Sequence, residues 1–336
     1  MTANASVDPQ QTKLLQEYKL DRPLIACHWD PQSRFIFCGA EDFLVHRIDP
    51  ASGQKISLAA HDSWIRAFGS SLDGETLYSG GYDGRLIYWP ATAEKPEPSR
   101  TIEAHQGWIR AIAVSPDGDS IATCGNDRMV RVWDPVSGTL VRQFSGHTSH
   151  VYNLIYSQDS RWLFSCDLKG VVNAWALDSD TPRTLVTVDP LHGYDTTFRA
   201  DIGGARSIAL RGDGGQIALG GITKVSNAFA GVGEIIVALV NPADGKLDLV
   251  LQSKDKTTGT TWGLAWHPDG FWLGLSGGSG GGWLYFWKGD TAEEFFRLQL
   301  KNDGRGMSLS PDGKHVAVAH ADNSLRTYSL AGSVPG

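Results

Sequence analysis

The sequence predicts an all-β fold of seven repeated four-stranded sheets that close into a ring. Three observations predict it: a tight-turn tetrapeptide that recurs seven times, a composition rich in Trp and Gly, and a missing strand at one end of the repeats that a spare strand at the other end can supply. The 336 residues include 12 Trp and 39 Gly but only 3 Met, which indicates many short strands separated by Gly-containing turns.

The tetrapeptide sets the period of the repeat. Its third residue recurs every 41 to 44 residues, except for two longer steps of 54 and 56 residues. In most copies Asp is third and Gly fourth, and Pro is often second, so each copy can close a hairpin between two strands. The copies occupy residues 30–33, 71–74, 115–118, 157–160, 211–214, 267–270 and 310–313.

The ends of the chain indicate how the ring closes. Strand-like runs around each turn give four antiparallel strands in most repeats, but the last repeat has only three and ends at Leu330. An orphan strand, Lys13 to Leu20, precedes the first repeat, and its pairing with the last repeat would leave no exposed sheet edge at the junction. We therefore predict a disordered tail over residues 1–11, the ring over residues 12–330 and a C-terminal tail over residues 331–336.

Four polar positions recur in the best-formed repeats, and they carry a family resemblance. The third repeat has them as His105, Thr123, Asp127 and Trp133, and the second as His61, Ser79, Asp83 and Trp89. In these residues the chain resembles the WD-repeat β-propeller family, over essentially all of its length after about residue 12. The resemblance implies a seven-bladed propeller in which each set forms a buried hydrogen-bonded chain, here called the blade lock.

The other repeats depart from this pattern. The fourth keeps His147, Ser165 and Trp175 but has Lys169 where the family places Asp, which predicts an incomplete blade lock. The first, fifth and seventh have Ile48, Leu239 or Val240, and Tyr328 near the Trp position. Those blades are expected to depend on apolar packing instead.

The resemblance also predicts a binding site. In WD-repeat propellers a position at the start of each first strand borders the central channel, and counting back five residues from each turn gives Ile25, Arg66, Arg110, Tyr152, Arg206, Trp262 and Arg305. Trp64 and Trp108 place an aromatic ring next to two of these arginines. Because Arg, Trp and Tyr predominate in binding hot spots and clustered Arg attracts carboxylate or phosphate, we predict an anionic protein or peptide partner. In the alternative interpretation, the arginines pair with acids such as Glu41 or Asp62 and the tryptophans cover the core.

Two long connections, about residues 189–204 and 222–233, are predicted on the same face of the ring. The second carries an apolar stretch, 225–229, that either grips a partner or is disordered. His192, Tyr194 and Asp195 in the first are the candidates for an alternative function, a propeller enzyme or small-molecule binder. The sequence has no recognisable carboxylate pair, nucleophile elbow or phosphate loop, so we predict no catalytic residue, no metal and no cofactor.

Charge and hydropathy narrow the class of partner. The formal net charge is −7, which disfavours nucleic acid and anionic membranes as partners. Residues 1–17 lack the features of a signal peptide, and no run of about 18 apolar residues occurs. The four scattered cysteines are expected to be reduced and buried. We expect a cytoplasmic, monomeric scaffold that works within a larger complex.

Overall fold

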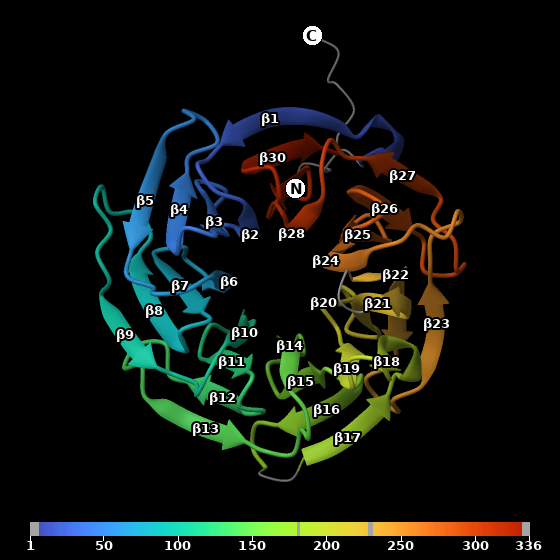
Figure 1. Cartoon of the computed structure of the whole chain (residues 1–336). Helices are drawn as coiled ribbons and strands as arrows, with labels where there is room; N and C mark the ends of the chain where they lie inside the picture. The colour runs from blue at the N-terminus through green and yellow to red at the C-terminus, as the bar shows by residue number, and fades with distance from the viewer. Residues whose placement is uncertain (1–6, 180–181, 228–230, 331–336) are drawn as a thin grey trace.

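Seven four-stranded antiparallel sheets stand around a central axis in the computed structural model, which describes residues 7–179, 182–227 and 231–330 (Figure 1). In each blade the first strand lies nearest the axis and the fourth lies at the rim (Figure 1). The only helices of the described ranges are two short 3-10 turns, Pro9–Gln11 and Asp189–Leu191. The predicted seven-bladed β-propeller is therefore confirmed.

The first four blades follow one another without interruption. Blade 1 consists of β2 (Leu24–Trp29), β3 (Ile36–Ala40), β4 (Leu44–Ile48) and β5 (Lys55–Ala59). Blade 2 consists of β6 (Ile65–Ser70), β7 (Thr76–Gly81), β8 (Arg85–Pro90) and β9 (Arg100–Glu103). Blade 3 consists of β10 (Ile109–Val114), β11 (Ile121–Gly125), β12 (Val130–Trp133) and β13 (Leu140–Phe144). Blade 4 consists of β14 (Val151–Tyr156), β15 (Trp162–Asp167), β16 (Val171–Ala176) and β17 (Pro182–Thr187).

An additional hairpin separates blades 4 and 5. It pairs β18 (His192–Asp195) with β19 (Ala200–Gly203). Blade 5 consists of β20 (Ser207–Leu210), β21 (Ile217–Asn227), β22 (Val232–Val240) and β23 (Leu247–Leu251). Blade 6 consists of β24 (Thr260–His267), β25 (Phe271–Gly277), β26 (Trp283–Trp287) and β27 (Phe296–Gln299). Blade 7 consists of β28 (Gly304–Leu309), β29 (His315–His320), β30 (Ser324–Ser329) and β1 (Lys13–Lys19).

The repeated turns form the hairpins between first and second strands. In blade 2, Ser71 Oγ donates to Asp73 Oδ1 at 2.6 Å, and the same oxygen accepts the Glu75 backbone N–H at 2.9 Å. The turns of blades 3, 4 and 7 repeat this Ser-x-Asp arrangement. The Asp side chain thus satisfies a backbone donor that the tight turn leaves unpaired, which explains why Asp recurs in this position.

The hydrophobic core is divided among the interfaces between blades. Buried apolar residues form seven clusters, and each cluster joins two neighbouring blades. Between blades 2 and 3, for example, Tyr78 and Tyr88 pack with Ile121 and Trp133. Each sheet therefore buries both faces, which stabilises it only while both neighbours are present.

The N-terminal strand closes the ring. β1 pairs antiparallel with β30, from Lys13 opposite Ser329 to Lys19 opposite Ser324, and the two lie side by side at the top of Figure 1. The buried Arg326 guanidinium donates to Glu17 Oε2 and to Asp322 Oδ2, each at 2.7 Å. The hydrogen bond from Arg326 lowers the pKa of Glu17 to about 2. This contribution to stability is present above about pH 4.5 and is lost as the pH falls toward 2.

The residues just before β1 also contact the ring. Pro9–Gln11 form a 3-10 turn capped by Asp8, and the Val7 backbone N–H donates to Asp269 Oδ2 at 2.7 Å. Val7 packs on the cluster between blades 6 and 7. Residues 7–11 of the predicted tail are thus placed against blade 6, whereas residues 1–6 and 331–336 lie outside the described residues.

Deletion of residues 1–20 should lower stability strongly, because it unpairs β30 and removes Tyr18 and Glu17 from the closing interface. We expect the free energy of unfolding to fall by more than about 4 kcal/mol, with a fall of roughly 8 °C or more in the thermal midpoint. Circular dichroism during thermal unfolding measures both variants. Deletion of residues 1–6 is the control and should leave the midpoint unchanged; an unchanged midpoint after the longer deletion contradicts closure by β1.

Candidate functional site

A β-bulge opens almost every innermost strand and presents one side chain at the channel. The ladder between first and second strands shifts register around Ile25, Arg66, Arg110, Tyr152, Trp262 and Arg305. In blade 5 the equivalent residue, Arg206, immediately precedes β20, and its backbone N–H donates to Gly220 O. A bulge leaves one residue out of the alternation of the strand and redirects its side chain.

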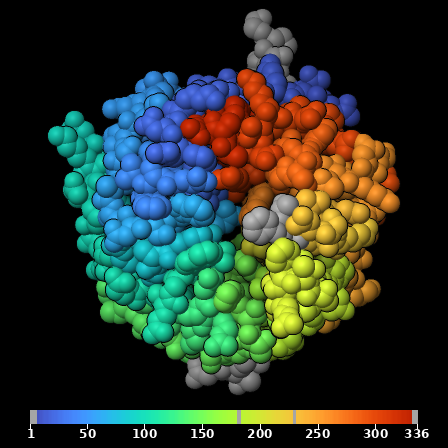
Figure 2. Space-filling model, viewed as in Figure 1, coloured from blue at the N-terminus to red at the C-terminus, as the bar shows by residue number. Residues whose placement is uncertain are grey.

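These seven residues line one cavity of about 410 Å³ at the end of the channel, here called the channel mouth. It includes all seven positions that the count from the turns predicted. The remaining lining residues are Glu41, Trp64, Tyr82, Gly278, Asp303 and Gly304. Figure 2, which views the ring along its axis, shows a small hollow near the centre where the blades meet. The radial arrangement of the blades brings these residues together, although they lie far apart in the chain.

Among the described residues, one of the four arginines in the channel mouth is paired with a carboxylate. Arg305 Nη1 lies 2.7 Å from Glu41 Oε1. Arg66 Nη1 donates to Ile25 O at 3.1 Å, and Arg110 Nε donates to Asn126 Oδ1 at 2.8 Å. Within the described ranges, Arg66, Arg110 and Arg206 have no ion pair. The alternative interpretation therefore holds for Arg305 with Glu41, whereas Asp62 pairs with Arg85 at 2.5 Å, outside the channel mouth.

Aromatic rings support the three guanidinium groups that have no carboxylate. Arg206 and Arg110 both lie over the Tyr152 ring, with guanidinium carbons 4.1 and 4.4 Å from its centroid. Arg66 lies 4.7 Å from the Trp262 ring, which Arg206 approaches at 5.8 Å. The cation–π interaction with these rings offsets part of the free energy that the guanidinium groups lose with their hydration, but it leaves their positive charge in place.

The four cations also act on one another. Burial is the main cause that lowers the pKa of Arg66; Tyr82 opposes the decrease, and repulsion from the other three arginines adds to it. Burial likewise lowers the pKa of Arg110, with Tyr152 and Tyr82 opposing. Arginine stays protonated near neutral pH despite such shifts, so the channel mouth keeps a concentrated positive charge.

An aromatic surface continues from the channel mouth over blades 2 and 3. Tyr82 stacks on Trp108 with ring centroids 4.0 Å apart and planes 1° from parallel, and Trp64 lies 6.1 Å from Tyr82. Trp64 and Trp108 remain 41% and 40% exposed. We call Trp64, Tyr82 and Trp108 the aromatic surface; such partly exposed rings next to charged groups are typical of binding sites.

The first long connection folds into the β18–β19 hairpin. Asp201 Oδ1 accepts from His192 Nε2 at 2.8 Å, and Lys169 Nζ lies 3.3 Å from Asp201 Oδ2. Asp195 instead accepts the backbone N–H groups of Thr197 and Phe198, and Tyr194 is 57% exposed. Of the three residues considered for an enzyme, His192 and Asp195 thus have separate partners within the hairpin, and Tyr194 is largely exposed.

Glycine allows this hairpin to return close to the channel mouth. Gly204 has φ +80°, and a Cβ there would lie 2.6 Å from Tyr152 Cδ2. The second long connection extends β21 and β22 beyond the length of their counterparts in other blades. Of its predicted apolar stretch, Val225 to Asn227 belong to β21, while Ala228 and Phe229 lie outside the described residues.

The blade locks have the expected geometry in blades 2 and 3. In blade 2, His61 Nδ1 contacts Asp83 at 2.9 Å, its Nε2 contacts Ser79 Oγ at 2.8 Å, and Trp89 Nε1 donates to the same hydroxyl at 2.8 Å. His105, Asp127, Thr123 and Trp133 repeat this arrangement in blade 3. Burial raises the pKa of Asp83, but the hydrogen bond and charge of His61 outweigh it, so the pKa of this carboxyl lies below its usual range.

Blade 4 has a complete blade lock, so the prediction of an incomplete one was wrong. His147 Nδ1 contacts Asp167 Oδ2 at 3.1 Å, while its Nε2 and Trp175 Nε1 both contact Ser165 Oγ. Asp167 comes two residues after Ser165, whereas Asp83 comes four residues after Ser79. Gly81 stands in the equivalent place in blade 2, where a Cβ would lie only 2.5 Å from His61 Nδ1. The acid thus reaches the same histidine from either position, and Lys169 is free to pair with the β18–β19 hairpin.

Blades 1 and 7 use other polar contacts in addition to packing. His46 contacts Ser57 Oγ at 2.9 Å and Asp42 Oδ2 at 3.0 Å in blade 1. In blade 7, Tyr328 OH lies 3.4 Å from His320 Nε2, and burial lowers the pKa of His320 to about 4. Blades 1 and 7 thus each bury a histidine, His46 and His320, although neither stands at the position of the family pattern.

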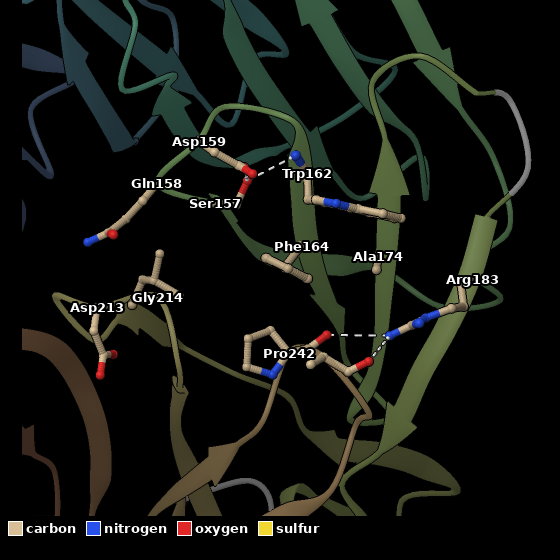
Figure 3. A pocket seen from close by; sticks show the side chains of 12 residues that line it. Ser157, Gln158, Asp159, Trp162, Phe164, Ala174, Arg183, Asp213, Gly214 and Pro242 are labelled. Carbon is tan, nitrogen blue, oxygen red and sulfur yellow. Dashed lines mark hydrogen bonds between the residues drawn. The ribbon is translucent and has the colours of Figure 1, made fainter.

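A second cavity, of about 430 Å³, lies between blades 4 and 5 (Figure 3). Trp162 and Phe164 line it together with Arg183 and Pro242 (Figure 3). Its polar groups already have partners: Arg183 Nη2 donates to Ala243 O at 3.0 Å, and Asp159 accepts from Ser157 Oγ at 2.6 Å. The channel mouth differs because it gathers three cations, on Arg66, Arg110 and Arg206, that have no ion pair among the described residues.

The described residues contain neither a candidate metal site nor a helix that could span a membrane. No three or more His, Cys, Asp or Glu side chains gather in a way that could hold a metal ion. No helix in this part of the chain has the length and apolar character needed to cross a membrane. All four cysteines are free and buried.

Comparison with known families identifies the repeats. The model of the WD domain, G-beta repeat, matches residues 53–90, 96–134 and 138–176. The chain carries WD40 repeats within its seven-bladed β-propeller. Each matched segment runs from the outer strand of one blade through the first three strands of the next, so every WD40 repeat links two blades. The matches end in blades 2, 3 and 4, the same blades that contain the full His, Ser or Thr, Asp and Trp chain.

Moving the acid of the blade 4 lock tests its geometry. Asp167→Gly should cost about 2 kcal/mol in the free energy of unfolding, because a buried charge-assisted hydrogen bond is lost. Adding Lys169→Asp should recover most of that loss, since Gly and Asp then stand as in blades 2 and 3; the exposed Lys169–Asp201 pair contributes little. Denaturant titration measures both variants, with Lys169→Asp alone as control. A double variant no more stable than Asp167→Gly contradicts this account of the lock.

Proposed function

We propose that this protein is a non-catalytic scaffold that binds an anionic protein or peptide segment at the channel mouth. WD40 propellers generally serve as protein-interaction scaffolds. The observation that carries the proposal is the set of three guanidinium groups, on Arg66, Arg110 and Arg206, that lack a carboxylate partner within the described chain. An acidic segment supplies the missing counter-charge, and the aromatic surface supplies apolar contact area next to it.

The alternative of an enzyme or small-molecule binder has no comparable support. His192 bonds to Asp201 and Asp195 accepts the Thr197 backbone N–H within the β18–β19 hairpin, while Tyr194 is exposed. The channel mouth holds arginines and aromatic rings where acid–base chemistry needs converging acids or bases. Nucleic acid is disfavoured by the net charge of −7. We further propose a monomer located in the cytoplasm.

Charge reversal in the channel mouth tests the scaffold function. Arg66→Glu combined with Arg110→Glu should reduce recovery of bound partner by roughly 30-fold or more, corresponding to about 2 kcal/mol, because the new carboxylates neutralise Arg206 and repel an acidic segment. Affinity purification followed by quantitative mass spectrometry measures recovery, and thermal unfolding checks that the variant is folded.

The matched control reverses two arginines on the opposite face. Arg161 directly follows the tetrapeptide turn of blade 4, and Arg211 begins that of blade 5; they pair with Asp159 and Asp213 of those turns. Arg161→Glu combined with Arg211→Glu changes the net charge equally and should leave partner recovery unaffected. Equal recovery with the channel-mouth variant and the wild type would refute binding at this site.

A further inference from the structure

The charge of the channel mouth favours a dianion. Its charged lining consists of four guanidinium groups and two carboxylates, Glu41 and Asp303, which leaves two positive charges uncompensated. The Arg305–Glu41 pair accounts for one guanidinium directly. The excess charge is therefore concentrated on Arg66, Arg110 and Arg206. A single carboxylate balances only half of it.

Arg206 shows that a hydrogen-bond acceptor is missing. Its Nε atom is buried and has no hydrogen-bond partner among the described residues, and its side chain forms no ion pair with any of them. Buried polar groups in native proteins are almost always hydrogen-bonded, because an unpaired donor costs about 1–3 kcal/mol. An acceptor that enters from outside the chain satisfies this N–H group.

The aromatic contacts leave the N–H edges of the guanidinium groups available. A guanidinium that packs its face on a ring still directs its donors outward in its own plane, which is the geometry that binds phosphate oxygens in pairs. Arg206 and Arg110 share the Tyr152 ring, and Arg206 and Arg66 share the Trp262 ring. Two rings thus hold three cations around one cavity, with Arg206 between the other two.

We propose that the channel mouth binds a phosphorylated serine or threonine side chain of a partner protein, an inference that rests on the scaffold function proposed above. A phosphate monoester carries a charge of about −1.5 to −2 near pH 7 and offers three acceptor oxygens. It matches the two uncompensated charges, and its oxygens match the donors of Arg66, Arg110 and Arg206. The aromatic surface takes an apolar residue next to the phosphorylated one.

A phosphoprotein fits this site better than a nucleic acid does. A phosphodiester carries one negative charge per group, and nucleic-acid sites usually add aromatic faces on which bases stack. Here the faces of Tyr152 and Trp262 are occupied by guanidinium groups, and the lining includes no Lys. The aromatic surface lies to one side, where only Trp64 and Trp108 remain substantially exposed.

Peptide pools with one fixed position test the proposal on the full-length protein. The immobilised protein receives a degenerate pool with phosphoserine at the fixed position, matched pools with Ser or Glu there, and a single-stranded oligonucleotide. We expect retention of the phosphoserine pool to exceed that of the other two pools by roughly tenfold, the effect of about 1.4 kcal/mol. Inorganic phosphate should compete for binding, whereas acetate at equal ionic strength should not.

Arg206→Gln and Arg211→Gln form a matched pair of variants, because these residues flank the same strand, β20, at the channel end and at the opposite end. Arg206→Gln removes no side-chain hydrogen bond to the described residues, so the fold should be kept, and retention of the phosphoserine pool should fall to that of the Ser pool. Arg211→Gln should retain it like the wild type.

Each other outcome overturns the proposal in a distinguishable way. Equal retention of the Glu and phosphoserine pools refutes phosphate recognition while leaving an anionic partner intact. Retention of the oligonucleotide alone indicates a nucleic-acid site. Unchanged retention in Arg206→Gln places the phosphate elsewhere. If no pool is retained although the charge reversals abolish partner recovery, the scaffold function stands and the phosphate inference fails.

Discussion

The pairing of β1 with β30 is the constraint on which the rest of the structure depends. Every blade buries both faces against its neighbours, and all seven apolar clusters lie between blades. No blade of such a ring has a hydrophobic core of its own. The interface between the last and first blades must therefore be closed by a contact between the two ends of the chain. Arg326, held between Glu17 and Asp322, adds a buried polar connection at that closure. Once the ring is closed, the starts of seven first strands have to encircle one axis.

The channel mouth depends on a local irregularity in six of the seven blades. A regular strand would direct the residue at its start into an interface between blades, whereas the bulge turns it toward the channel. In blade 5, Arg206 reaches the same cavity from the position just before β20. Seven single residues, one from each blade, thus line one cavity. The positive charge of the channel mouth is neutralised at one arginine: Glu41 pairs with Arg305. No carboxylate of the described chain pairs with Arg66, Arg110 or Arg206. Cation–π contacts with the rings of Tyr152 and Trp262 stabilise these half-buried guanidinium groups.

Much of this arrangement could be predicted from the sequence, because the repeat carries it. The Ser-x-Asp turns fix the period, the period fixes the blade number, and a constant offset from each turn finds Arg66, Arg110, Tyr152, Arg206, Trp262 and Arg305. Interactions outside the period could not be predicted in this way. Asp167 replaces the expected acid from two residues earlier, and residues 189–204 form a hairpin with its own Asp201 contacts. The sequence offers Glu41 as a partner of the arginines in the alternative interpretation, but it does not identify Arg305 as the arginine that Glu41 reaches. Each depends on a distance in space that the spacing along the chain does not encode.

The central claim is that three cations in the channel mouth have no counter-ion among the described residues. A crystal structure of the full-length protein soaked with tungstate tests it directly, because the anomalous signal of this dianion locates it independently of the fitted coordinates. The account predicts the strongest peak within contact distance of Arg206 and of Arg66 or Arg110. A channel mouth filled by a carboxylate of the same chain, with tungstate bound only elsewhere, would contradict it.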